Sequence, residues 1–154
     1  MALKETLMDD LKLSMKEKDT VRKNAVQSVR AAILQVEKDN KVTLKDDDII
    51  GVIAKEVKKR KDVLPEYEKS GREDLIAELK REIEILMGYL PSQLSKSELD
   101  EIVCASINAV GAQSMKDMGK IMADVMPKVM GRADGRAVNE AVKAYFSGKS
   151  SIGE

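Results

Sequence analysis

Apolar residues recur at spacings of three and four along almost the whole chain, and no stretch alternates apolar and polar side chains as a half-buried strand does. A period of 3.6 residues places the apolar side chains on one face of an α-helix. These helices must pack through aliphatic side chains and methionine, because the 154 residues include one Phe, three Tyr and no Trp. The pattern predicts an all-α protein.

The apolar stripes predict seven helices joined by short connectors. The third helix should begin at the acidic residues 46–48, which favour the positive end of a helix, and should be kinked or ended by Pro65. The fourth carries a stripe from Leu75 to Leu90. The other five are expected at about residues 3–18, 20–38, 96–109, 115–129 and 134–147.

Side chains that cap helices stand at several of the expected starts. Asp19, or the threonine after it, is placed to cap the second helix. Ser70 with Glu73 and Ser95 with Glu98 have the serine-to-glutamate spacing of capping boxes. These pairs predict where the fourth and fifth helices begin.

A proline and several serines interrupt the helical pattern in the segment YLPSQLSKSELDE, residues 89–101. Such a composition marks a link between compact units. It predicts an N-terminal four-helix domain at residues 1–92 and a C-terminal three-helix domain at residues 93–154.

Positive and negative charges balance, because 27 Lys and Arg residues stand against 27 Asp and Glu residues. Net charge therefore predicts no attraction to nucleic acid or membrane, and any such attraction must come from local clusters. The start, MALKETLMDDLK, shows no signal peptide, and no apolar run approaches the roughly 20 residues that cross a bilayer. We expect a soluble cytoplasmic protein without a membrane partner.

The chain contains no histidine, the commonest general base near neutral pH and a common ligand of transition metals. Its single cysteine, Cys104, lies among apolar residues, so core packing is favoured over a role as a nucleophile. The acidic residues 46–48 lack the glycine and the final glutamate of a calcium loop. We expect no catalysis, no metal and no cofactor.

The segment MPKVMGRADGRAV, residues 126–138 and hereafter the corner, joins the last two expected helices through a proline and two glycines. Pro127 lies near the end of the first of these helices. Gly131 suits a left-handed C-cap, and Asp134 suits the N-cap of the next helix. These features explain a sharp change of direction without any ligand.

Three cations at the corner, Lys128, Arg132 and Arg136, are not needed for that change of direction. They stand beside the start of a helix, where backbone amides are free, and the combination suits a phosphate. Exposed arginines are also common, so a purely structural corner remains an alternative. The candidate nucleic-acid contacts at the corner and on the adjoining helices are Lys120, Lys128, Arg132, Arg136 and Lys143.

Two neighbouring features are also open to two interpretations. The run KEVKKRKD, residues 55–62, is the densest basic stretch, and a solvated helix surface is favoured over a phosphate-binding patch. The methionine stripe from Met115 to Val129 is interpreted as core in preference to an adaptable partner surface. Gly119 within the stripe is expected to allow a close helix approach.

The segment MGKIMADVMPKVMGRADGRAVNEAVKAYF, residues 118–146, resembles the signature of the GatB/YqeY domain. The positions that match the pattern are Gly119, Pro127, Lys128, Gly131, Arg132, Ala133, Asp134 and Gly135. The upstream segment KKRKDVLPEYEKSGREDLIAELKREIEILMGYLP is similar to stand-alone YqeY proteins, so the resemblance covers nearly the whole chain. It implies an all-helical N-terminal unit followed by a three-helix tail of the GatB/YqeY type.

The resemblance also implies a setting in tRNA biology. The related tail of the GatB subunit of tRNA-dependent amidotransferases helps to hold tRNA, and YqeY-type modules are fused to some glutaminyl-tRNA synthetases. The family association is with carbon–nitrogen ligases that use glutamine as amido donor, although the catalytic sites of those enzymes have no counterpart here. We expect a non-catalytic tRNA-binding or accessory module, with tRNA as partner and no DNA. The alternative is an adaptor that docks on an amidotransferase or aminoacyl-tRNA synthetase without RNA contact.

Overall fold

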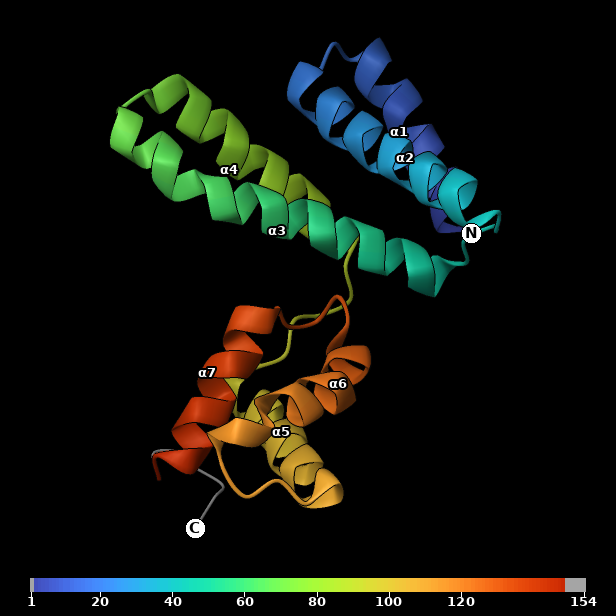
Figure 1. The fold of residues 1–154 in the computed structure, drawn as a ribbon. Helices are drawn as coiled ribbons and strands as arrows, with labels where there is room; N and C mark the ends of the chain where they lie inside the picture. Colours follow the sequence, from blue (N-terminus) through green and yellow to red (C-terminus); the bar gives the residue numbers. More distant parts are fainter. Residues whose placement is uncertain (1, 149–154) are drawn as a thin grey trace. The chain divides into compact units, whose positions relative to one another are not determined.

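The computed structural model describes residues 2–148 of the chain (Figure 1). This part consists of seven α-helices and one short 3-10 turn, without a strand, which confirms the all-α prediction. In chain order the elements are α1 (Leu3–Lys16), α2 (Thr20–Asn40), α3 (Asp46–Ser70), α4 (Glu73–Met87), α5 (Lys96–Val110), η1 (Met115–Asp117), α6 (Met118–Val129) and α7 (Gly135–Phe146). The chain divides after Leu90 into two compact units, α1–α4 and α5–α7.

In the first unit, α1 packs against α2 and α3 packs against α4 (Figure 1). The faces that meet are aliphatic, and Leu7, Val26, Val29, Ile53 and Leu86 are fully buried. Each such side chain contributes about 1.5–3 kcal/mol when it leaves water. Aliphatic burial therefore holds the four helices together without aromatic side chains at the centre.

Two helix starts in this unit follow the sequence. Asp19 caps α2, because its carboxylate accepts a hydrogen bond from the backbone N–H of Arg22 at 3.2 Å, and this prediction is confirmed. Helix α3 begins at Asp46, and the Asp48 carboxylate accepts from the backbone N–H of Lys45 at 3.1 Å. The acidic residues thus lie where the positive end of the helix dipole favours them.

Of the two effects predicted for Pro65, a kink or an end of the third helix, the end is wrong, because α3 continues through Pro65 to Ser70. Packing along α4 stabilises this part of α3 despite the hydrogen bond that proline cannot donate. The capping box predicted for Ser70 and Glu73 is also wrong. The Ser70 hydroxyl instead donates to the Tyr67 carbonyl at 2.6 Å, and Gly71, with φ at 71°, ends α3.

In the second unit, α5, α6 and α7 enclose a separate core of Leu, Ile, Val and Ala. Val103, Ile121, Val125 and Val138 are almost completely buried in it. The methionines at 118, 122 and 126 are half-buried and pack against this core, which confirms the core interpretation of the stripe, whereas Met115 is exposed. Among the described residues, no helix is long and apolar enough to cross a membrane.

A half-buried ionic cluster joins α3 and α4. The Arg60 guanidinium lies 3.2 Å from the Glu56 carboxylate, and its Nε lies 3.6 Å from Glu82, close enough for an ion pair but too far for a hydrogen bond. Burial raises the pKa of the Glu82 carboxyl above its ordinary value of 4.5, and the Arg60 charge offsets only part of that effect. The ionised form of Glu82 is therefore disfavoured in the folded protein.

Replacing Glu82 with Gln should raise the unfolding free energy relative to wild type by an amount that grows as the pH rises from about 4 to about 7. In that pH window the folded state binds more protons at Glu82 than the unfolded state does. The contribution of Glu82 to the unfolding free energy of the wild type therefore falls as the pH rises. Urea unfolding of both proteins at several pH values measures the difference. Glu84→Gln, which removes an exposed carboxylate from the same helix, is the matched control. A Glu82→Gln difference that shrinks with rising pH would contradict the cause assigned to the shift.

Candidate nucleic-acid interface

A single tight turn forms the centre of the corner. Helix α6 ends at Val129, Met130 has φ −52° and ψ 124°, and Gly131 has φ 77°. The backbone N–H of Arg132 donates to the Val129 carbonyl at 2.8 Å, which closes a turn of the type II class. The left-handed backbone predicted for Gly131 is confirmed, and the residue is buried.

Helix α7 begins directly after this turn. The Asp134 carboxylate accepts from the backbone N–H of Ala137 at 2.8 Å, which confirms the predicted N-cap. Gly135 is the first residue of α7, and a Cβ there would lie 4.0 Å from the Met122 methyl group, in ordinary contact. Pro127 is exposed in the last turn of α6. The structural residues of the motif therefore set where α6 ends and α7 begins.

The turn also holds the entry segment of the second unit, residues 91–94. The Gln93 side-chain amide donates to the Gly131 carbonyl at 2.7 Å, and the Leu94 N–H donates to the Arg132 carbonyl at 2.9 Å. Arg132 returns a hydrogen bond from its Nε to the Ser92 carbonyl at 2.9 Å. Three hydrogen bonds thus join segments about 40 residues apart in the sequence.

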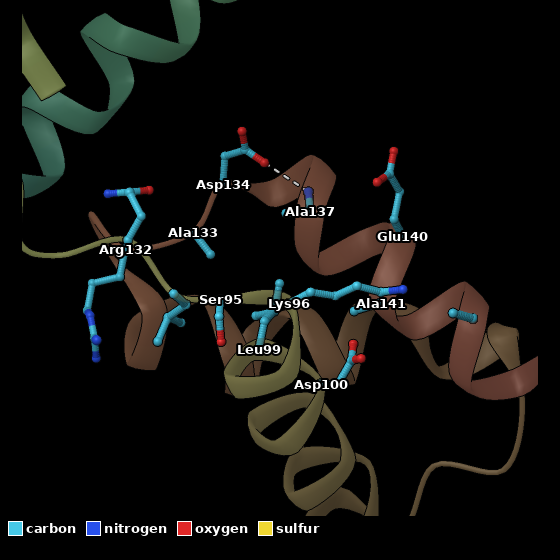
Figure 2. Close-up of a pocket in the computed structure, with 13 residues that line it drawn as sticks. Ser95, Lys96, Leu99, Asp100, Arg132, Ala133, Asp134, Ala137, Glu140 and Ala141 are labelled. Carbon is cyan, nitrogen blue, oxygen red and sulfur yellow. Dashed lines mark hydrogen bonds between the residues drawn. The ribbon is translucent and has the colours of Figure 1, made fainter. Parts of the chain in front are cut away.

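Arg132 is half-buried, and its side chain points away from α7 in Figure 2. Its guanidinium therefore does not face the helix that carries Arg136. The pKa of the Glu98 carboxyl lies below its ordinary value mainly because the backbone N–H of Ser95 donates to it, with a smaller contribution from the Arg132 charge. The same pair confirms the capping box predicted at the start of α5.

Lys128 is held by a carboxylate one helical turn away. Its Nζ lies 2.9 Å from Asp124 Oδ2, and the buried Ser106 hydroxyl donates to the same oxygen. The hydrogen bond from Ser106 is the larger cause, and that from Lys128 the smaller, of the lowered pKa of Asp124. About half of the Lys128 side chain, 52%, remains exposed. Its charge is partly compensated, and its position is fixed.

The other three candidate cations are exposed and form no ion pair with any residue that the structure describes. Arg136 lies in the first turn of α7 and Lys143 about 10 Å further along that helix. Lys120 lies about 12 Å before Lys128 along α6. The structure thus places Lys128, Arg132 and Arg136 around one turn, while Lys120 and Lys143 lie farther out along the helices.

The basic run on α3 is compensated more fully than the corner. Lys59 and Arg60 both pair with Glu56, at 3.0 and 3.2 Å, and Lys58 lies 3.7 Å from Asp62. Only Lys55 and Lys61 of this run form no ion pair among the described residues.

Two further expectations concern Gly119 and Cys104. A Cβ added to Gly119 would meet no atom within 4 Å, so the predicted close helix approach is wrong. Gly119 is exposed because α6 packs inward through Met118, Ile121 and Met122 instead.

Cys104 is half-buried on α5, outside the buried core cluster, and the Asn108 amide lies 3.9 Å from its sulfur. Within residues 2–148, no group of three or more His, Cys, Asp or Glu side chains could hold a metal ion.

The groups that fix the corner cations, three side chains and the Ser92 carbonyl, were not predicted from the sequence. Ser106 and Asp124 position Lys128, and Ser92 and Gln93 bind the turn. The spacing of four between Asp124 and Lys128 is a signal that could have been used. The other contacts join distant parts of the chain and leave no local pattern.

Replacing Gly131 with Ala should destabilise the second unit by about 1–2 kcal/mol, because a Cβ disfavours the left-handed backbone. Gly119→Ala is the matched control and should stabilise the same unit by about 0.5 kcal/mol, because Gly119 is helical and open to solvent. Amide hydrogen exchange of peptides from α6 and α7 in the full chain measures both effects. Equal protection in the two variants would contradict the role given to Gly131.

A family described as Yqey-like protein matches residues 4–146 of the chain. Several fungal relatives carry the name "altered inheritance of mitochondria protein 41, mitochondrial". The relative from Pyrenophora tritici-repentis is 28% identical over 123 residues, covering 76% of this chain and 67% of its own length. The relative from Vanderwaltozyma polyspora is 32% identical over 119 residues, covering 73% and 64%, respectively.

The relative from Kluyveromyces lactis is 38% identical over 84 residues, covering 54% of this chain and 45% of its own length. The chain thus spans about half to two thirds of the length of these curated relatives. The family match is longer, and it takes in the corner and helices of both units. The chain therefore belongs to the Yqey-like protein family.

Proposed function

We propose that this chain is a non-catalytic tRNA-binding or accessory module that contacts the phosphate backbone at the corner. The proposal combines the family membership with the resemblance of the corner to the tail of the amidotransferase B subunit. The cytoplasm remains the compartment predicted from the sequence, whereas the names of the fungal relatives place those proteins in mitochondria.

The observation that carries the proposal is the placement of Lys128, Arg132 and Arg136 around one hydrogen-bonded turn. Lys128 is fixed by Asp124, and the Arg132 Nε is fixed by Ser92. Side chains that are already ordered lose less conformational entropy when they bind. Each still has donors left for a phosphate, because Lys128 is half exposed and the terminal nitrogens of Arg132 are not used in the bond to Ser92.

The Arg132 guanidinium points away from α7, the helix that carries Arg136, so the three cations do not converge on one point (Figure 2). This arrangement favours a polyanion over a single phosphate. An RNA strand presents phosphates at successive positions, so cations spread around a turn contact several of them at once. The first amides of α7 add a partial positive charge at the same place.

Recognition by stacking on aromatic rings has little support in the second unit. Its Tyr145 and Phe146 pack edge to face, with ring centroids 5.2 Å apart, and both lie against the core. At the corner, contacts to phosphate and sugar, guided by the shape of the RNA, are therefore the main mode of recognition that we expect.

The adaptor function is the second candidate, and the exposed Met115 and Met130 favour it. Most of the methionine-rich face is turned into the core, which leaves a small apolar surface for a protein partner. Capture of an amidotransferase or a synthetase that survives nuclease treatment would support this candidate.

Replacing Lys128 and Arg136 together with Gln should weaken tRNA binding and reduce the slope of log affinity against log salt by about 1.5, since each phosphate contact contributes about 0.7–0.9. Arg132 is kept in this variant because it holds the entry segment. Gel-shift titrations with total tRNA at several salt concentrations measure the slope.

The matched control is the Lys55→Gln, Lys61→Gln double variant, which removes the same charge from the two lysines of the 55–62 run that form no ion pair among the described residues. Its slope should equal that of wild type. If the slope fell equally in both double variants, net charge alone would explain the effect. If it fell only in the α3 variant, the RNA interface would lie on α3.

A further inference from the structure

A groove of about 510 Å³ lies next to the corner, between the first turns of α5 and one face of α7 (Figure 2). Arg132, Asp134 and Ala137 line it, so the groove and the corner share residues. Its size falls in the range of about 300–1,000 Å³ that is typical of sites for small ligands.

The floor of the groove is apolar and consists mainly of alanine side chains. The residues that supply it are Leu99, Ala133, Ala137, Ala141 and Ala144. A flat, uncharged group could lie on such a floor without displacing large side chains.

The charged residues around the floor do not favour a phosphate. Three carboxylates line the groove, Asp100, Asp134 and Glu140, against the two cations Lys96 and Arg132. Asp100 is only 4% exposed and already has an interaction of its own, so its carboxylate is not available to a ligand. The remaining carboxylates, Asp134 and Glu140, balance the charges of Lys96 and Arg132, so the groove has no excess positive charge to attract an anion.

Hydrogen-bond chemistry favours a group that carries an amino substituent. Glu140 is exposed on α7, and Figure 2 shows the Lys96 side chain extending from α5 towards α7, below Glu140 in that view. A carboxylate accepts from an exocyclic amino group such as N4 of cytosine, and an ammonium donates to a ring nitrogen or carbonyl.

We infer that this groove takes one unpaired, amino-bearing nucleobase of the RNA whose backbone is held at the corner. The inference rests on the proposed function and adds a base-reading site to it. An RNA strand with a phosphate at the corner would present its neighbouring base to the groove, because Arg132 and Asp134 belong to both.

A basic side chain of a partner protein is the competing occupant, since the groove is lined by more carboxylates than cations. Continuity with the phosphate-binding corner favours the base.

Filling the groove with Ala144→Leu should weaken binding of total tRNA about ten-fold, the order of effect expected from steric exclusion in a small pocket. The slope against salt should stay at the wild-type value, because no phosphate contact is removed. Ala144 is half-buried at the edge of the groove. Ala109→Leu, at an exposed site on α5, adds the same volume outside the groove and should leave binding unchanged.

Glu140→Gln tests whether the Glu140 carboxylate recognises the amino group of the base. Wild type should bind oligo(rC) more tightly than oligo(rU), which lacks the amino group, and the variant should lower that ratio. Comparing the two oligonucleotides cancels the general gain in affinity from removing a negative charge. Glu101→Gln, an exposed carboxylate of α5 outside the groove, should keep the wild-type ratio.

The outcomes separate this inference from the proposed function. Wild-type protein that binds no RNA would overturn both. Salt-dependent binding through the corner, with Ala144→Leu and wild type equal in affinity, would overturn the groove alone. A third outcome is that a partner protein binds wild type and fails to bind Ala144→Leu, while the two bind tRNA with equal affinity. That result would assign the groove to a side chain of the partner protein and would overturn the inference that it takes a nucleobase.

Discussion

The left-handed backbone at Gly131 is the constraint on which the second unit depends. With φ at 77°, this residue reverses the chain directly after Val129, so that α7 can return its apolar face to α5 and α6. The same turn presents the Gly131 carbonyl to Gln93 and places Arg132 against Ser92. One residue without a Cβ therefore determines both the packing of α7 and the attachment of the entry segment.

Local pairing, more than the number of cations, distinguishes the two basic stretches of this protein. On α3, two cations share Glu56, and the run is largely compensated within its own unit. At the corner, Asp124 holds Lys128 in one position while leaving it half exposed, and Arg136 is open to solvent. A balanced net charge is compatible with RNA binding of this kind, because the attraction between a phosphate and a cation acts over short distances in salt.

The parts of the fold that could be predicted from the sequence depend on neighbours within a few residues. The cap at Asp19 and the left-handed Gly131 belong to this class, as does the helical period itself. The continuation of α3 through Pro65 could not be predicted, because packing against α4 stabilises it. In the site, the cations were visible in the sequence, but the anchoring of Arg132 depends on a hydrogen bond between residues 40 positions apart. The groove is likewise formed by segments that meet only in the folded chain.

The most direct test of the account is a lysine acetylation footprint of the wild-type protein with and without tRNA, read by mass spectrometry for each lysine. Contact with phosphate at the corner predicts that tRNA protects Lys128, while Lys55 and Lys61 on α3 react equally in both samples. Protection of the α3 lysines with no change at Lys128 would contradict the central claim that the Gly131 turn presents cations to RNA.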